Sequence, residues 1–141
     1  MFQHRRCSFS AILMLMNSPI MKRIISLEYA VATVAVIVFY LNLGQFAWYW
    51  LPIALVAFDI SMIGYLINPR IGALCYNIGH SIIGPALLMV AYIFTENQAM
   101  LFISLLWLFH IFADRTMGYG MKHETGFQHT HLGKIGHHKQ K

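Results

Sequence analysis

The chain has 141 residues, of which 58% are hydrophobic and only 11% are charged, with a formal net charge of +5. A soluble domain carries about 25% charged residues, so this composition excludes an ordinary soluble protein and indicates a membrane protein. The positive charge does not indicate nucleic-acid binding, because the basic residues stand at the ends of apolar segments and in the C-terminal tail, where the positive-inside rule places them. The two cysteines, Cys7 and Cys75, lack the spacing of a disulfide framework or a thiolate metal site.

Residues 1–20 imitate a short signal peptide, with a basic start and an apolar run, but the run is too short to span a membrane and no small-residue cleavage site follows it. The next residues, MKRIISLEYA, are themselves a suitable translation start with a basic anchor. We therefore expect residues 1–20 to be a disordered extension or mis-assigned upstream sequence, with Met21 as the true start. A tryptic peptide from residues 7–20 of the native protein would contradict the second interpretation.

Nearly unbroken apolar runs follow, each long enough to cross a bilayer as a helix; they cover residues 24–42, 47–67, 71–94 and 99–118. The links between them, NLGQ, NPR and TENQ, are very short, and short links make consecutive helices antiparallel. We predict an all-α membrane protein in which residues 21–120 form an up-down bundle of four transmembrane helices. A prolyl residue, Pro85, should kink the third helix. Residues 121–141 form a basic, His-rich tail.

Basic residues lie on one side of this predicted bundle. Lys22 and Arg23 precede the first segment, Arg70 lies in the second link, and lysines follow the fourth segment, whereas the first and third links contain no Lys or Arg. The positive-inside rule therefore places both termini and residues 68–70 in the cytoplasm.

Polar and ionisable side chains inside the predicted helices gather in the cytoplasmic half. At a rise of about 1.5 Å per residue they reach similar depths, roughly 9–13 Å from the cytoplasmic ends or nearer the surface. Such groups are costly in hydrocarbon, so they pair with one another or line a wet cavity. We therefore predict one polar pocket, open to the cytoplasm, between the second, third and fourth helices. The residues concerned are Asp59, Asn77, His80, His110, Asp114 and Arg115.

Spacing along the fourth helix refines this prediction. His110 and Asp114 are four residues apart and share a helix face. Arg115 points about 100° away from Asp114, which favours an ion pair with Asp59 or Glu28.

A short internal similarity supports a second description of the bundle. Asp59-x-Ser61-Met62 and Asp114-x-Thr116-Met117 are both followed closely by Gly-Tyr, and each closes the second helix of a hairpin. The sequence leaves open whether the bundle consists of two parallel two-helix repeats.

Two stretches, FDISMIGYLINPRIGALCYNIGHSIIGP and WLFHIFADRTMGYGMKHETGFQHTHLG, resemble a family of small bacterial membrane proteins known as domain of unknown function 4260. The resemblance covers residues 27 to about 136, and Phe58 departs from it where the family pattern has proline. It implies a multi-pass protein of the bacterial inner membrane, and it implies no activity. The motifs that carry it are Asp59-x-x-Met62-x-Gly64-Tyr65, Tyr76-Asn77-x-x-His80, His110-x-x-x-Asp114-Arg115, Gly118-Tyr119-Gly120 and Thr130-His131-Leu132-Gly133.

The polar residues suit a metal-dependent hydrolase or transferase that acts on lipids. His80, His110 and Asp114 would bind zinc or another divalent ion and leave a fourth position open for water. His131 in the tail would add a further ligand. Asp59, Asn77 and Arg115 would be the catalytic residues: Asp59 as general base or orienting residue, and Asn77 or Arg115 holding a developing oxyanion.

Two other functions fit the same residues. The first is a non-enzymatic membrane subunit or adaptor, in which the polar groups form a clamp that fixes helix packing. The second is a small proton-coupled transporter, although the apolar outer half offers no exit path. The lipid bilayer is the expected partner, a homo-oligomer is left open, and no nucleic acid is expected.

Overall fold

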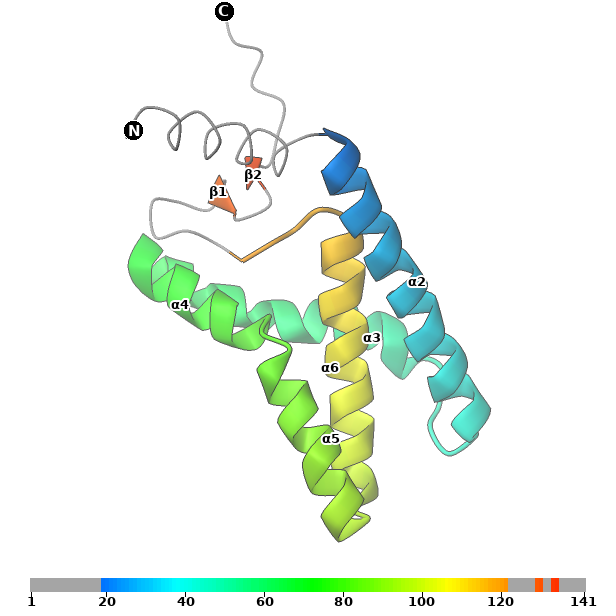
Figure 1. Ribbon diagram of the computed structural model, residues 1–141. Coiled ribbons are helices and arrows are strands. Elements are labelled where there is room, and N and C mark those ends of the chain that lie inside the picture. Colours follow the sequence, from blue (N-terminus) through cyan, green and yellow to red (C-terminus); the bar gives the residue numbers. More distant parts are fainter. Residues whose placement is uncertain (1–18, 122–128, 131–132, 135–141) are drawn as a thin grey trace, which may run out of the picture.

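The computed structural model describes residues 19–121, 129–130 and 133–134 (Figure 1). The sequence predictions for residues 1–18 and for most of the His-rich tail lie outside these residues. The helices are α2 (Pro19–Leu43), α3 (Trp50–Ala57), the 3₁₀ helix η1 (Phe58–Leu66), α4 (Pro69–Gly79), α5 (Ile83–Thr95) and α6 (Gln98–Thr116). Two short strands, β1 (His129–Thr130) and β2 (Gly133–Lys134), pair antiparallel.

The predicted all-α fold built from four apolar helical segments is confirmed. The segments correspond to α2, to α3 with η1, to α4 with α5, and to α6. Among the described residues, Ile20–Leu43, Pro69–Thr95 and Gln98–Thr116 are long and apolar enough to cross a membrane, and Trp50–Leu66 is apolar but shorter. The protein is therefore a membrane protein by the length and composition of its helices.

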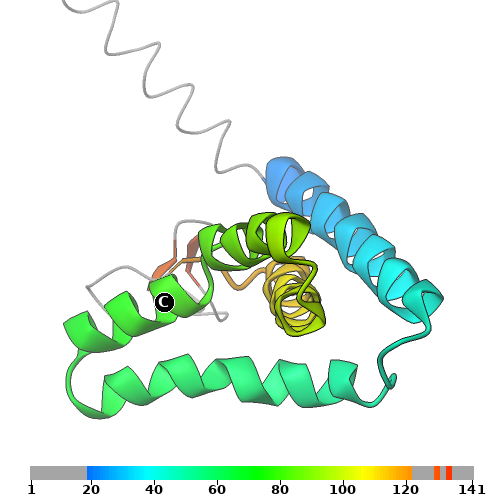
Figure 2. The ribbon, with the colours of Figure 1, turned by 90° about the horizontal axis from the view of Figure 1, so that it is seen from below.

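The arrangement is less regular than four parallel rods. Helices α2 and α5 pack along α6, which lies at the centre of the molecule (Figure 1). The α3–η1 segment and α4 form a hairpin that runs across α6 (Figure 1). Figure 2, which looks almost along α6, shows α2 and this hairpin on different sides of that helix. The hairpin and α6 therefore meet near the level at which the polar residues lie.

The third segment is broken at residues 80–82, which confirms the predicted kink. Pro85 has no N–H to donate, and its ring would clash with the carbonyl of residue 81 in a continuous helix. Helix α4 consequently ends at Gly79, and α5 starts at Ile83 in a new direction (Figure 1). His80 is left at the C-terminal end of α4, and its ring reaches His110 on α6.

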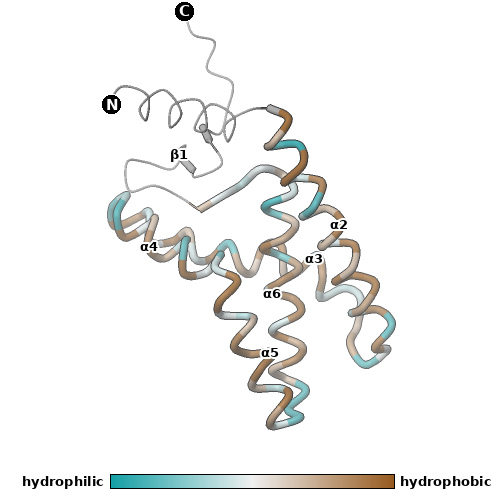
Figure 3. The backbone as a smooth tube through the Cα atoms, viewed as in Figure 1, coloured by the Kyte–Doolittle hydropathy of each residue, from teal (hydrophilic) through white to brown (hydrophobic). Residues whose placement is uncertain are grey.

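Large apolar side chains are exposed on every long helix, and Figure 3 shows that α2 and α5 consist mostly of hydrophobic residues. On α2 the residues Leu27, Val31, Val34 and Val38 follow the three- and four-residue spacing of one helix face, and each is more than half exposed. A soluble protein rarely exposes so large an apolar surface, whereas lipid covers it at no cost. The buried apolar core lies on the other side of these helices, around Tyr40, Leu51, Ala54, Leu101, Leu105, Leu106 and Phe109.

Two glycines of α4 allow side chains of η1 to pack directly against the α4 backbone. A Cβ atom placed on Gly72 of α4 would lie 2.3 Å from the ring of Tyr65 on η1, and one on Gly79 would lie 2.8 Å from Ser61. Small residues at helix interfaces are the usual means of packing in membrane proteins, where burial of apolar surface gives no net gain.

We predict that Gly72→Ala destabilises the protein by about 1–3 kcal/mol, the usual cost of overpacking, because the added methyl group meets the Tyr65 ring. The measurement is the thermal unfolding of the purified protein in detergent. Leu74→Ala, at an exposed position of the same helix, is the control and should be nearly neutral. Adding Tyr65→Leu should restore part of the lost stability, and a Gly72→Ala protein as stable as the parent would contradict this packing.

Candidate metal centre

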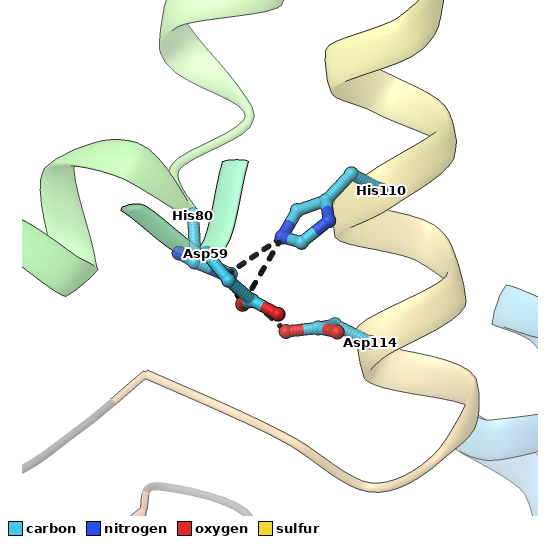
Figure 4. Close-up of side chains that lie close together, drawn as sticks. All are labelled: Asp59, His80, His110 and Asp114. Atoms are coloured by element: carbon cyan, nitrogen blue, oxygen red, sulfur yellow. Dashed lines mark hydrogen bonds and ion pairs between the residues drawn. The ribbon is translucent and has the colours of Figure 1, made fainter. Parts of the chain in front are cut away.

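Four side chains from three elements converge on one point (Figure 4). His110 and Asp114 come from α6, His80 from the end of α4, and Asp59 from the first turn of η1. One ligand atom of each residue lies within 4.8 Å of those of the other three. His80, His110 and Asp114 are buried, and the Asp59 side chain is 47% exposed.

The shortest distances involve Nε2 of His80. It lies 2.9 Å from Nε2 of His110, 3.2 Å from Oδ2 of Asp114 and 3.8 Å from Oδ1 of Asp59. Oδ1 of Asp59 is also 3.8 Å from Nε2 of His110. With zinc–nitrogen bonds of 2.0–2.1 Å, neighbouring ligand atoms in a tetrahedral site lie about 3.3 Å apart. The His80 distances to His110 and Asp114 are close to that value, Asp59 is about half an ångström further from both histidines, and all four ligand atoms lie within 4.8 Å of one another.

The other nitrogen of His80 determines how the ring is protonated. Nδ1 lies 3.0 Å from the backbone carbonyl oxygen of Tyr76 and 3.4 Å from the hydroxyl of Ser61. A carbonyl oxygen only accepts hydrogen bonds, so Nδ1 carries the proton and donates it. In the neutral ring Nε2 then presents a lone pair toward His110 and the two carboxylates. Ligating histidines in metal sites commonly donate their second nitrogen to a backbone carbonyl in this way.

The lone pair on Nε2 of His80 can accept a hydrogen bond from Nε2–H of His110, 2.9 Å away, or bind a metal ion placed between the histidines and the carboxylates. Figure 4 shows that the side chains point toward a common centre and not past one another.

Tyr76 contacts two members of the cluster, Asp114 and His80. It was not predicted as a site residue. Its hydroxyl donates to Oδ2 of Asp114 at 3.2 Å, and its ring stacks on His80 with centroids 3.7 Å apart and planes 15° apart. The signal was present in the sequence, because Tyr76 and His80 are four residues apart on one helix and must share a face.

The remaining predicted site residues are not members of the four-residue cluster. Asn77 is on α4, partly exposed, and contributes to none of the distances that define the cluster. His131 lies outside the described residues. The expected ion pair of Arg115 with Asp59 or Glu28 is wrong for the part of the chain described: the guanidinium lies over the Tyr29 ring of α2, 5.4 Å from its centroid. Helix α2, and not η1, packs on that side of α6.

A narrow crevice adjoins the cluster, where a polar pocket open to the cytoplasm was predicted. It is too narrow for a water molecule, and it is covered by the chain that leaves α6. Gly118, with φ +87°, turns the chain back: the N–H of Gly118 donates to the carbonyl of Arg115, and that of Tyr119 to the carbonyl of Asp114. The crevice is lined by Tyr76, His80, Ile111, Asp114, Arg115, Tyr119, Gly120 and Met121.

The fold and the cluster define an all-α membrane protein in which two buried histidines, one buried carboxylate and one exposed carboxylate meet at one site. Residues 22–135 match the model of the family described as "Domain of unknown function (DUF4260)", and the chain belongs to that family. The family resemblance seen in the sequence is thereby confirmed. No curated protein and no solved structure matches the chain.

We predict that Tyr76→Phe and Asp114→Ala are energetically coupled, because the first variant removes the donor and the second the acceptor of one interhelical hydrogen bond. Such bonds in a membrane protein are worth about 0.6 kcal/mol on average and at most about 1.7. A double-mutant cycle on the unfolding free energy in detergent measures the coupling. The control pair is Tyr92→Phe with Asp114→Ala, which should be additive because Tyr92 is on the distant half of α5. Additivity of the Tyr76 pair would show that the bond does not form.

Proposed function

We propose that the protein binds a divalent metal ion, zinc foremost, through His80, His110 and Asp114, and that this site hydrolyses or transfers groups on membrane lipids. The observation that carries the proposal is the orientation of His80: its Nδ1–H is fixed by a backbone carbonyl, and its Nε2 lone pair meets a second imidazole and two carboxylates. Imidazole and carboxylate groups are the usual ligands of zinc in catalytic sites.

Each member of the cluster has a distinct part in this proposal. His80, His110 and Asp114 are buried and close together, as ligands must be. Asp59 stands 3.8 Å from both histidine nitrogens and is exposed, so it can accept a proton from a water molecule or enter as a fourth ligand. A bound divalent ion would lower the pKa of a water molecule and polarise the bond to be broken.

The site's place in the membrane supports a lipid substrate. Asp59 is its exposed member and lies on the α3–η1–α4 hairpin, whose outer side chains are apolar. In Figure 1 the first turn of α2, which carries Lys22 and Arg23, lies at the same end of the molecule as the last turn of α6. The basic residues at that end favour a protein of the bacterial inner membrane with both termini in the cytoplasm.

The second candidate is a structural clamp, in which the polar groups fix the packing of the helices. The short distances from Nε2 of His80 to His110 and Asp114 favour it as well. If His80 carries two protons, its Nε2–H can donate to Asp114 or His110, and the cluster joins α4, α6 and η1 without any ion. The protein would then be a membrane subunit or adaptor that acts through a partner. The two candidates differ in one measurable quantity, the bound metal.

We predict close to one zinc, iron or manganese ion per chain in protein purified from membranes without a histidine tag, measured by mass spectrometry. The double variant His110→Ala with Asp114→Ala should contain none, and the bound metal should fall on acidification, because protons compete for the imidazole nitrogens. Glu28→Gln, at an exposed position of α2, is the matched control and should keep the metal.

The His-rich tail needs a control of its own, since it could hold metal adventitiously. A variant with all five tail histidines replaced, at positions 123, 129, 131, 137 and 138, should keep its metal if the centre is the buried one. A parent protein without metal, with the double variant merely less stable, would exclude the metal enzyme and leave the clamp. If metal is present, hydrolysis should be tested on phospholipids and isoprenoid lipids.

A further inference from the structure

Arg115 is a buried cation whose donors are largely unused. Its residue is 9% exposed, and it follows Asp114 on α6. Among the residues that the structure describes, its guanidinium donates one long hydrogen bond, 3.5 Å, to the backbone carbonyl of His80, and it packs over the ring of Tyr29. A guanidinium has five N–H donors, and the described ion pairs include no carboxylate partner for it.

An unpaired charge in this setting is costly. Charged side chains in membrane helices pair with an opposite charge or with backbone carbonyls, or line a polar cavity. The Tyr29 ring and one distant carbonyl meet little of that requirement. Arginine binds planar and tetrahedral anions through two parallel N–H donors, and phosphate is its commonest tetrahedral partner. These donors of Arg115 are available to an anion that comes from outside the described chain.

The guanidinium lines the same crevice as two of the proposed metal ligands, His80 and Asp114. A divalent ion would neutralise Asp59 and Asp114, and the charge of Arg115 would then remain in excess. An anion in the crevice would stand between Arg115 and the ion and balance that charge. Residues 119–121, which line the crevice, belong to no helix, and an anion enters only if they move outward, which breaks the hydrogen bond from the N–H of Tyr119 to the carbonyl of Asp114.

We propose that Arg115 binds a phosphoryl group beside the metal centre, so that the substrates are phosphate esters. This inference rests on the proposed metal function and gives it a substrate class. In hydrolysis of a phosphate monoester, water forms a bond to phosphorus and the ester oxygen–phosphorus bond breaks. Asp59 accepts a proton from the attacking water, and the leaving oxygen takes up a proton from solvent, which yields an alcohol and inorganic phosphate.

The test uses the full chain in phosphatidylcholine nanodiscs, with metal content and thermal unfolding measured on the same samples. Inorganic phosphate is titrated against chloride at equal ionic strength, and phosphatidic acid is added to the lipid in a parallel series. Bound phosphate should raise the unfolding temperature with concentration. Arg115→Gln should bind phosphate at least about tenfold more weakly, the loss expected for a charge-assisted hydrogen bond, and should keep its metal. Arg70→Gln, at an exposed position in the first turn of α4, should bind phosphate as tightly as the parent.

The outcomes separate this inference from the proposed function. Bound metal, together with phosphate affinity that is unchanged in Arg115→Gln, would overturn the phosphoryl site and leave the metal centre standing. A parent protein that phosphate and phosphatidic acid stabilise no more than chloride does would also overturn it, even if the variant fails to fold. Stabilisation by phosphatidic acid alone identifies a lipid phosphate, and stabilisation by inorganic phosphate alone identifies a soluble one. A metal-free parent that still needs Arg115 to bind phosphate would retain the anion site and remove the metal enzyme.

Discussion

The site depends on the different contacts of the two nitrogen atoms of one imidazole ring. His80 uses Nδ1 to bind the carbonyl of Tyr76, one turn earlier in its own helix, and uses Nε2 to reach His110 and Asp114 on α6. His80 is the C-cap of α4, and its backbone N–H still donates to the same carbonyl. The break before Pro85 follows directly, so the cluster lies beside the point where the third segment changes direction.

The hairpin formed by α3–η1 and α4 brings Asp59 and His80 to α6. Helix η1 is nine residues long, whereas 3₁₀ helices seldom exceed three or four. Its rise of about 2.0 Å per residue, against about 1.5 Å in an α-helix, lets α3 and η1 together reach about 30 Å. This segment runs across α6 instead of along it (Figure 1), so its length extends the hairpin over the side of α6. The tighter helix also sets where Asp59 meets the two histidines, and Gly79 allows Ser61 to approach Nδ1 of His80.

The sequence was sufficient for the features that depend on local geometry. The spacing of His110 and Asp114 placed both on one face of the fourth helix. Pro85 predicted the interruption of the third helix, which leaves His80 at the end of α4. The convergence of Asp59 with these three followed from their common depth. The partner of Arg115 could not be predicted, because the 100° step gives its direction around α6 but not which helix packs there. Tyr76 could not be distinguished from its neighbour Asn77 as the residue that contacts α6, because the depth of a side chain in the membrane does not give its contacts.

Charge balance connects the two proposals and distinguishes them from the clamp. Two carboxylates, Asp59 and Asp114, and one guanidinium, Arg115, leave one negative charge around His80. A second proton on His80 makes the group neutral, and a clamp of that kind needs no further ligand. A divalent ion instead leaves one positive charge, which only an additional anion offsets, so a metal enzyme in this fold would be expected to bind an anionic substrate. Phosphate affinity should therefore rise when metal is loaded, because the same ion that would activate water also changes the sign of the charge that the crevice presents.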